Sequence, residues 1–231
     1  MVQKGCFYGH LKENYNPGSK RIVAARVGSL DIIDLEKTVS YISKAQKFIV
    51  SVVSAEGVIL FVGTKRQAKK IVKDTAEDIG MPYVSERWLG GTLTNFQTIR
   101  RRINYFERLE VRLKTGAFEK KTKEEKNLIE REIESLRKNF DGLKKLKDLP
   151  QALVIVDPNV EHVALKEAKI LGIPVVATSD TNIDTNKIDY PIPINDDSSD
   201  SIEIFMRAIS DAVKEGLRLQ TIQKVSVKKE V

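Results

Sequence analysis

Short apolar runs alternate along the chain with longer segments in which apolar residues recur every three or four positions. Runs at 58–62, 83–85, 152–156, 175–178 and 188–194 are bounded by glycine, proline or charged residues, a pattern typical of strands. They lack the strict alternation of a half-exposed sheet, which favours a parallel sheet covered on both faces. We therefore predict an α/β fold with about five strands. The last run should lie at an edge, because prolines interrupt it.

Segments with helical spacing connect these runs. The predicted helices span 35–53, 65–79, 160–171 and 201–219. Asp34 is the expected N-cap of the first helix, because its carboxylate can accept hydrogen bonds from the free N–H groups of a first turn. The tail after Thr221 is predicted to be poorly ordered.

The segment 97–147 contains no strand-like run. Two apolar series step through it by three or four positions: Ile99, Ile103, Phe106, Leu109 and Leu113, then Ile129, Ile133, Leu136, Phe140 and Leu143. Joined by a turn at 115–122, two such helices would pair their apolar stripes as an antiparallel coiled-coil hairpin. The predicted organisation is an α/β domain made of 1–96 and 148–231, with this hairpin inserted at 97–147.

The positive charge of the chain is concentrated in the predicted hairpin. The 231 residues include 39 Lys and Arg against 32 Asp and Glu, a net charge of +7. Segment 97–147 alone holds 16 basic and 9 acidic residues, so its net charge equals that of the whole chain. The block 148–200 is acidic and is expected to face solvent or a basic partner. This asymmetry favours a hairpin that contacts a polyanion.

Several classes of protein are disfavoured. The single cysteine, Cys6, excludes an internal disulfide framework, fits a reducing compartment and is expected to be inert. No apolar run approaches the ~20 residues of a membrane helix, and no signal peptide is recognisable, so a soluble intracellular protein without a membrane partner is expected. His10 and His162 are isolated from any nucleophile, which leaves little support for an enzyme.

Basic residues in the hairpin and before it are candidate nucleic-acid contacts. The run 100–102 is Arg-Arg-Arg, and guanidinium groups that fan around a helix cannot all pair internally and can reach phosphates. The segment 87–96 holds the only tryptophan beside Gly90 and Gly91. It is either an RNA-facing loop or a structural hinge with Trp88 in the core, and both can hold.

Two weaker candidates lie in the N-terminal half. Basic residues surround Tyr15 in an irregular segment, a mixture of charge and stacking that suits single-stranded RNA. Lys65 opens a predicted helix, where N–H groups favour a phosphate, but no nucleotide-binding glycine motif accompanies it. The complete set of predicted RNA-binding residues is Lys12, Lys20, Arg21, Arg26, Lys65, Arg66, Arg87, Trp88, Asn95, Arg100, Arg101, Arg102 and Arg108.

Carboxylates are expected to gather where neighbouring strands end. Asp180, Asp184, Asp196 and Asp197 follow predicted strands, and ligand sites of open α/β sheets lie at that edge. Clustered carboxylates can hold Mg²⁺, so a structural magnesium ion at Asp180, Asp196 and Asp197 is a candidate, although no cofactor is required. The alternative is that these side chains cap a helix and form a turn.

The segment 87–96, Arg-Trp-Leu-Gly-Gly-Thr-Leu-Thr-Asn-Phe, resembles the signature of the ribosomal protein S2 family. Further similar segments follow the family in order, among them Gly-Thr-Lys at 63–65, Asp-Pro-Asn at 157–159 and Asp-Thr-Asn at 180–182. The resemblance covers about 5–218. Departures include Tyr15, where most members have tryptophan.

The resemblance implies a flavodoxin-like domain with an inserted coiled-coil hairpin, and no enzymatic activity. It implies binding of small-subunit ribosomal RNA near the junction of head and body, carried most directly by Arg87, Asn95 and Arg100. It further implies contact with neighbouring small-subunit proteins, docking of ribosomal protein S1, and a place on a cytoplasmic or organellar ribosome.

Two other classes of function are left open by the residues themselves. One is an enzyme or phospho-receiver-like switch that uses Asp180, Asp196 and Asp197 with Mg²⁺. The other is a coiled-coil adaptor between proteins, without RNA. The interpretation favoured here is a structural RNA-binding component of the small ribosomal subunit.

Overall fold

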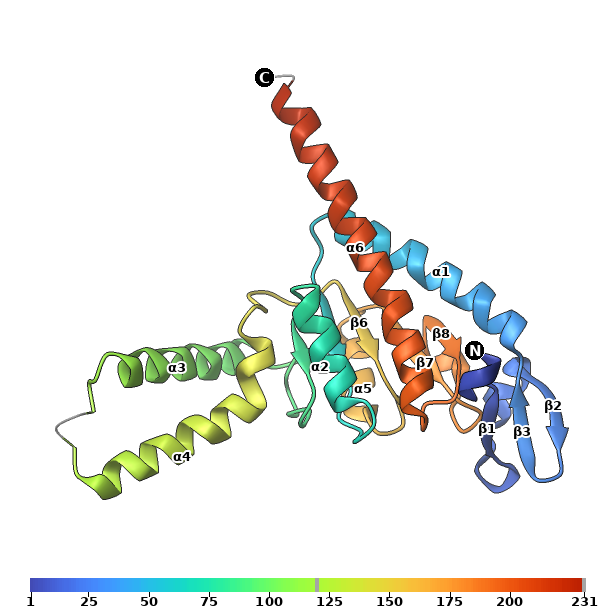
Figure 1. The fold of residues 1–231 in the computed structure, drawn as a ribbon, viewed down its shortest axis with the longest axis horizontal. Coiled ribbons are helices and arrows are strands. Elements are labelled where there is room, and N and C mark those ends of the chain that lie inside the picture. Colours follow the sequence, from blue (N-terminus) through green and yellow to red (C-terminus); the bar gives the residue numbers. More distant parts are fainter. Residues whose placement is uncertain (119–120, 230–231) are drawn as a thin grey trace.

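A parallel five-stranded sheet forms the centre of the molecule (Figure 1). The computed structural model describes residues 1–118 and 121–229, with side chains as far as residue 224. The strands are β4 (Ile59–Val62), β5 (Tyr83–Val84), β6 (Ala152–Ile155), β7 (Val175–Ser179) and β8 (Tyr190–Pro193). Their spatial order is β5-β4-β6-β7-β8, which is the flavodoxin-like order 2-1-3-4-5. The predicted α/β fold is confirmed, and the proline-containing β8 lies at an edge.

Helices cover both faces of this sheet. The helices are α1 (Leu35–Ser54), α2 (Lys69–Asp78), α5 (His162–Ile170) and α6 (Ser199–Lys229). Phe61 packs in a cluster with residues of α1, α2 and α6, whereas its neighbours Leu60 and Val62 pack with residues of α5. Because consecutive strand residues point to opposite faces, this burial on both sides explains the continuous apolar runs.

Two helices differ clearly from the prediction, apart from shifts of one or two residues such as that of α5, which begins at His162 rather than at 160. Asp34 accepts hydrogen bonds from the backbone N–H groups of Glu36 and Lys37, so the predicted N-cap of α1 is confirmed. Helix α2 begins at Lys69 rather than at Lys65, because 65–68 form a turn. Helix α6 continues to Lys229 where a poorly ordered tail was predicted, and residues 230–231 lie outside the described part of the chain.

A small antiparallel sheet at the N-terminal end was not predicted. It consists of β1 (Tyr8–Leu11), β2 (Val23–Val27) and β3 (Leu30–Ile33), in the order β1-β3-β2. The register shifts in both strand pairs, and β2 is largely exposed, so no alternating apolar pattern marks these strands. Short 3₁₀ helices complete the chain: η1 (Val2–Lys4), η2 (Lys12–Asn14), η3 (Pro17–Ile22), η4 (Asp141–Leu143) and η5 (Thr185–Lys187).

Two helices project from the body between β5 and β6 (Figure 1). They are α3 (Phe96–Lys114) and α4 (Lys123–Phe140), and they contact each other. Residues of both predicted apolar stripes are buried together, among them Ile103, Phe106 and Ile133. The buried stripe of α3 ends before Leu113, the last residue predicted for it, because Leu113 is 39% exposed. A coiled-coil geometry and the domain boundaries stay predictions, and part of the expected turn, 119–120, is not described.

Candidate nucleic-acid interface

The segment 87–95, here called the signature loop, leads from β5 into α3. Trp88 within it belongs to the core and is 8% exposed. Its indole Nε1–H donates to Glu167 Oε1 across 3.1 Å. A ring in this position cannot stack on an RNA base, so the structure contradicts the predicted RNA contact of Trp88 and supports the hinge interpretation for this residue.

The two ends of the signature loop face solvent. Arg87 and Asn95 are exposed, and within the described residues neither side chain makes a hydrogen bond or ion pair. Asn95 occupies the N-cap position of α3 without capping it. Both interpretations of the loop therefore hold, for different residues: its centre is structural, and its ends are available to a ligand.

The three arginines at 100–102, at the start of α3, also differ in their contacts: one is engaged inside the protein and two face solvent. Arg100 donates to the carbonyl oxygens of Lys144 and Leu146, at 3.3 and 3.5 Å, and so connects α3 to the chain that returns from the hairpin. These contacts give Arg100 a structural role, and its predicted contact with RNA stays a prediction. Arg101 and Arg102 are exposed, and no partner for either occurs among the residues that the structure describes.

The acidic residues of α3 do not neutralise the exposed arginines. Glu107 lies 3.8 Å from Arg100, and Glu110 accepts hydrogen bonds from Arg137 at 3.0 Å and Lys144 at 2.6 Å. Partial burial alone would raise the pKa of Glu110, but these two cations outweigh it and hold the pKa below its ordinary value.

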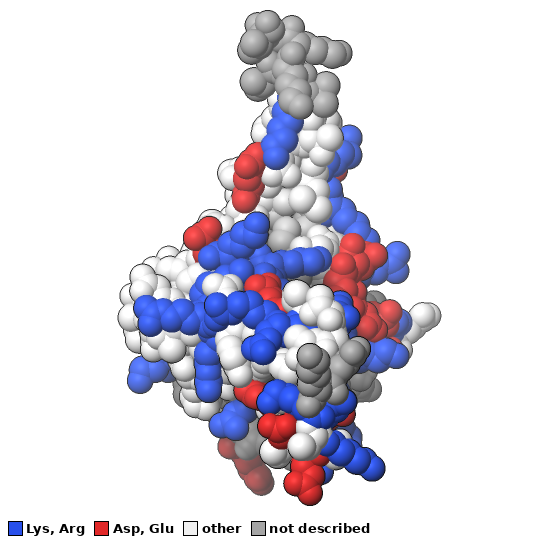
Figure 2. Space-filling model, turned by 90° about the vertical axis from the view of Figure 1, so that its left-hand side faces the viewer, with Lys and Arg blue, Asp and Glu red and all other residues white. Residues whose placement is uncertain are grey.

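Arg101, Arg102 and Arg108 of α3 are consequently uncompensated, and Arg112, which lies 5.0 Å from the centre of the Phe118 ring, also has no acidic partner among the described residues. Arg108 is exposed and, like Arg101 and Arg102, has no partner in the described part of the chain. Figure 2 views the molecule from the hairpin end and shows Lys and Arg side chains spread over much of this surface. Helix α3 therefore carries a basic face, although Arg100, which the sequence also assigned to that face, is engaged inside the protein.

The N-terminal candidates are also divided between structure and surface. Arg21 donates to the hydroxyl and the carbonyl oxygen of Thr185, both at 3.0 Å. Arg26 pairs with the buried Asp31 and lies 5.2 Å from the centre of the Tyr15 ring. The structure thus assigns Arg21 and Arg26 to internal contacts.

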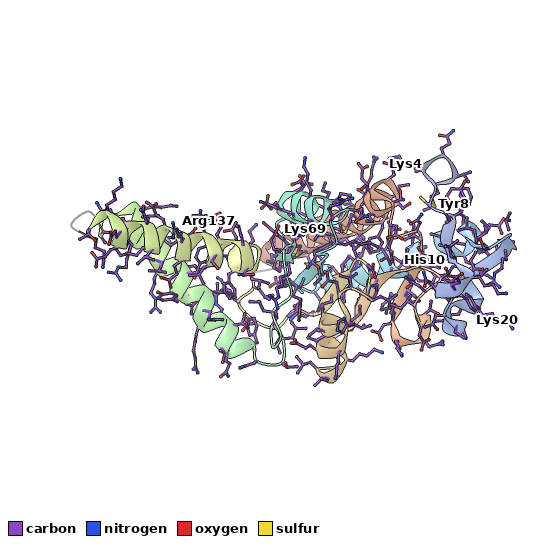
Figure 3. The ribbon with its side chains drawn as sticks, turned by 90° about the horizontal axis from the view of Figure 1, so that it is seen from below. Lys4, Tyr8, His10, Lys20, Lys69 and Arg137 are labelled. Atoms are coloured by element: carbon purple, nitrogen blue, oxygen red, sulfur yellow. The ribbon has the colours of Figure 1, made fainter. Side chains whose placement is uncertain are left out.

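Lys12, Lys20 and Arg66 are the free N-terminal cations. All three are exposed, and their side chains make no hydrogen bond or ion pair with any described residue. Figure 3 shows Lys20 and the hairpin residue Arg137 at opposite ends of the molecule. Lys20 therefore lies far from the exposed arginines of the hairpin, so the predicted RNA-binding residues do not form one patch.

Lys65 lies inside the carboxylate cluster at the edge of the sheet. Its ammonium Nζ is 2.8 Å from Asp157, 3.0 Å from Asp196 and 2.6 Å from Asp197. Burial alone would lower the pKa of Lys65, but these carboxylates outweigh it and raise the pKa above its ordinary value. The structure contradicts a phosphate contact for Lys65, because its charge is already matched.

His10 connects the N-terminal sheet to the same cluster (Figure 3). Its Nδ1 lies 3.1 Å from Asp180 and its Nε2 lies 3.3 Å from Asp197. The hydrogen bond with Asp180 raises the pKa of His10. The expectation that His10 is isolated was wrong, because two loops distant in sequence bring carboxylates to it.

Three residues of the predicted Asp cluster, Asp180, Asp196 and Asp197, lie together around Lys65 and His10, whereas Asp184 lies apart and forms a turn by accepting from the Asn186 N–H. Burial, together with the charges of Asp157 and Asp180, raises the pKa of Asp196 to about 7. Among the described residues, no group of three or more His, Cys, Asp or Glu is arranged to hold a metal ion. Mg²⁺ at this edge stays a prediction.

The acidic block 148–200 is partly internal. Asp157, Glu161, Glu167, Asp180 and Asp196 are buried. Each has hydrogen-bond or ion-pair partners inside the protein, as buried charges require. The expectation of a solvent- or partner-facing acidic surface was therefore wrong for these residues.

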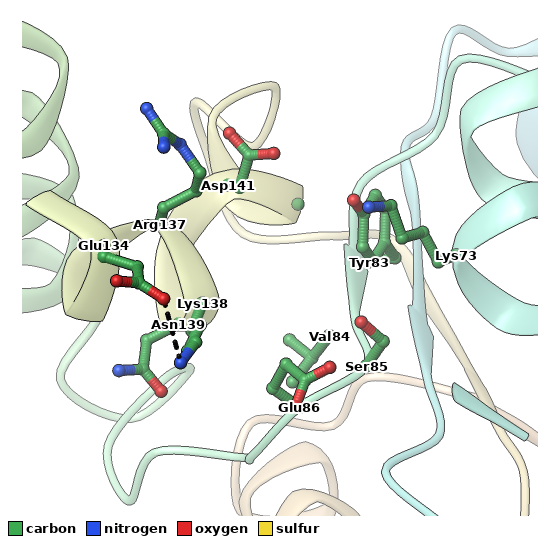
Figure 4. A pocket seen from close by; sticks show the side chains of 11 residues that line it. Lys73, Tyr83, Val84, Ser85, Glu86, Glu134, Arg137, Lys138, Asn139 and Asp141 are labelled. Carbon is green, nitrogen blue, oxygen red and sulfur yellow. Dashed lines mark ion pairs between the residues drawn. The ribbon is translucent and has the colours of Figure 1, made fainter. Parts of the chain in front are cut away.

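A hollow of about 470 Å³ separates the base of α4 from β5 (Figure 4). The cations that line it are already paired: Arg137 with Glu110, Lys138 with Glu134, and Lys73 with Glu77. The hollow therefore does not concentrate positive charge for an anion.

Among the described helices, none is long and apolar enough to cross a membrane.

Comparison with known proteins identifies the family. The family model for ribosomal protein S2 matches residues 1–216. The chain belongs to the ribosomal protein S2 family. The small ribosomal subunit protein uS2 of Mycobacterium leprae is 42% identical over 95% of this chain and 79% of its own length. That of Acidothermus cellulolyticus is 44% identical over 94% of this chain and 79% of its own length.

S2 membership settles the class of function. The chain is a constituent of a bacterial-type small ribosomal subunit, a structural and non-enzymatic protein associated with the ribosome and with translation. The enzyme and the RNA-free adaptor considered above are thereby set aside. Ribosomal RNA and other small-subunit proteins are its partners as a class.

Sequence reasoning missed Glu167, which binds the centre of the signature loop. Glu167 lies 76 positions from Gly91 along the chain. It stands on α5 beside the buried Ala164, Leu165 and Ala168, but no residue near it in the sequence supplies a partner for a buried carboxylate. A signal could be found only in the loop, whose tryptophan, glycine and threonine donors imply an unidentified acceptor.

Proposed function

We propose that this S2 protein binds small-subunit ribosomal RNA through α3 and the ends of the signature loop. The observation that carries the proposal is the set of exposed arginines Arg101, Arg102 and Arg108, which have no partner within the described residues. Unpaired guanidinium groups on a rigid helix can replace the counterions of several phosphates at once. Arg87 and Asn95 extend this surface by a cation and a free amide.

Helix geometry supports contact along one side of α3. Arg101, Tyr105 and Arg108 are separated by four and three positions, so they share a helix face. Arg101 and Arg108 lie about 10 Å apart along the axis at 1.5 Å per residue, so they reach different phosphates. Tyr105 lies between them and is 41% exposed, with its hydroxyl donating to Glu132 of α4, so only the exposed part of its ring is open to stacking.

The free cations at the N-terminal end of the body give the protein a second surface for contact with RNA. Lys12 and Lys20 lie at the N-terminal end of the body, away from the hairpin, so an RNA segment bound to α3 leaves them free to contact another segment. A protein with two separated cationic surfaces is suited to holding a junction between RNA segments. Its location would be the cytoplasmic ribosome, or an organellar ribosome.

Docking of ribosomal protein S1 is part of the same proposal, and the family resemblance is what supports it. The experiment compares small subunits assembled with and without this chain. We expect S1 to co-sediment only with the subunits that contain it, and equal S1 content in both preparations would contradict the docking role.

The RNA-binding claim is tested with the double variant Arg101→Glu/Arg108→Glu. Its matched control is Lys166→Glu/Lys169→Glu, which makes the same change in net charge at two exposed residues of α5. We expect the affinity for a small-subunit RNA fragment to fall roughly a hundredfold for the first variant and only slightly for the control, because each phosphate contact contributes to binding. Equal losses would contradict a specific surface on α3.

A further inference from the structure

Glu167 lies on α5, outside the surface proposed to bind RNA. Its side chain is held by five hydrogen bonds, and every donor belongs to the signature loop. Oε1 accepts from Trp88 Nε1–H at 3.1 Å and from the Gly91 N–H at 2.8 Å. Oε2 accepts from the Leu93 N–H at 2.9 Å, and from the Thr94 N–H and hydroxyl at 3.0 and 3.2 Å.

The carboxylate is saturated by these contacts. A carboxylate offers about four lone-pair sites, and five donors occupy them. Glu167 is also 6% exposed, so no further ligand can reach it. It therefore acts through the loop that it holds rather than by touching RNA.

The loop in turn determines where the RNA-facing groups stand. Arg87 precedes the first donor, Trp88, and Asn95 directly follows the last, Thr94. Helix α3 begins at Phe96, so the direction of its exposed arginines is set by the same loop. Leu93 is buried against the sheet, which gives the loop a second attachment.

We propose that Glu167 is the positioning residue of the RNA interface, holding the signature loop so that Arg87, Asn95 and the start of α3 face one RNA. The inference rests on the proposed function. Two of the five donors are side-chain groups, the Trp88 indole and the Thr94 hydroxyl, and the other three are backbone N–H groups of the loop. Position 167 requires a negatively charged group that only accepts hydrogen bonds, because the loop donates all five of them.

Glu167→Gln tests this requirement with almost no change in shape. The glutamine amide nitrogen would face N–H donors, so at least one backbone N–H group loses its acceptor. The matched control is Glu161→Gln, which alters another buried carboxylate at the start of the same helix. Glu161 accepts from the Thr64 N–H rather than from the signature loop.

Trp88 supplies a direct readout, because it is the only tryptophan and gives a single indole N–H signal in a ¹H–¹⁵N NMR spectrum. We expect Glu167→Gln to shift this signal and to lower RNA affinity roughly tenfold. The slope of log affinity against log salt should fall by about one, as one phosphate contact is lost. The circular dichroism spectrum and the Glu161→Gln control should remain unchanged.

A further variant shows whether Glu167 acts through Arg87. In an Arg87→Gln background, Glu167→Gln should lower RNA affinity much less than it does in the wild-type chain. Equal losses in the two backgrounds, or an unchanged salt slope, would overturn the positioning role and leave Glu167 as a general structural residue.

The outcomes separate this inference from the proposed function. If Arg101→Glu/Arg108→Glu loses affinity while Glu167→Gln keeps both affinity and indole signal, the positioning role fails and the RNA surface stands. If the arginine variant also binds normally, the proposed function itself fails. Should Glu167→Gln not fold, Thr94→Val decides the matter, since it removes one hydroxyl donor: an unchanged indole signal and affinity would overturn the inference.

Discussion

At the scale of single residues, the backbone conformation of Gly91 explains why the signature loop has a glycine at this position. Its φ is +85°, in the left-handed region, whereas the neighbouring Gly90 has no positive φ and no atom within 4 Å of a Cβ placed on it. We expect Gly91→Ala to lower the free energy of unfolding by about 1–2 kcal/mol, the cost of left-handed backbone for an L-residue. Gly90→Ala is the control.

Chemical denaturation measures both substitutions. The Gly90→Ala chain should differ from wild type by about 0.5 kcal/mol or less, as a surface substitution does. If the two alanine variants lose equal stability, the left-handed conformation of Gly91 is not what the loop requires.

Arg100 and Arg101 are adjacent, yet their contacts assign them different roles. Arg100→Ala removes the hydrogen bonds to the carbonyl oxygens of Lys144 and Leu146, and we expect it to lower the free energy of unfolding by about 1 kcal/mol. Arg101→Ala should leave stability within about 0.5 kcal/mol and weaken RNA binding instead. Thermal unfolding and RNA titration of both variants check this, and a destabilised Arg101→Ala chain would contradict the division.

The residue scale is where sequence reasoning was least complete. That a basic surface exists on α3 followed from its composition, but which arginines remain free depends on partners far along the chain. Arg100 is bound by carbonyls 44 and 46 positions away, and Lys65 by carboxylates 92 and 131 positions away. No local pattern contains these contacts, because folding creates them.

At the scale of elements, Glu110 attaches the hairpin to its own base. It accepts hydrogen bonds from Arg137 on α4 and from Lys144 beyond α4. Its pKa is lowered, so the ionised form is favoured in the folded state, and the stabilisation is present above the ordinary pKa of 4.5 and is lost as the pH falls through the folded pKa.

We therefore expect Glu110→Gln to lower the thermal midpoint at pH 7 and to have a much smaller effect below pH 4, where wild-type Glu110 is itself becoming protonated. Thermal unfolding of both proteins across this pH range gives the difference directly. A difference that stays constant from pH 7 to pH 3 would show that ionisation of Glu110 does not support the hairpin.

Elements with a strong local pattern were predictable, and those without one were not. The strands β4, β6 and β7 are continuous apolar runs because both of their faces are buried, and α3 and α4 carry apolar stripes because one face of each is buried. The N-terminal strands β1 and β2 are short, irregular in register and mostly exposed. Neither a continuous apolar run nor a regularly spaced apolar stripe therefore marks them in the sequence. Their position depends instead on contacts such as that of His10 with Asp180.

At the scale of the whole molecule, the net charge of +7 is less informative than its distribution. Five of the acidic residues after 147 are buried, among them Glu161 and Glu167, and two of these five, Asp157 and Asp196, pair with Lys65. The body thus places much of its negative charge inside. Lys and Arg side chains cover much of the hairpin end, and the free Lys20 lies at the opposite end of the molecule (Figures 2 and 3).

The central claim is that the uncompensated arginines of α3 attach this S2 protein to the small subunit. Sedimentation tests it directly: small subunits depleted of their own S2 protein are mixed with the wild-type chain or with Arg101→Glu/Arg108→Glu at moderate salt. We predict that the wild-type chain moves with the subunits while the variant stays at the top of the gradient. A variant that co-sediments as fully as the wild-type chain would contradict the claim.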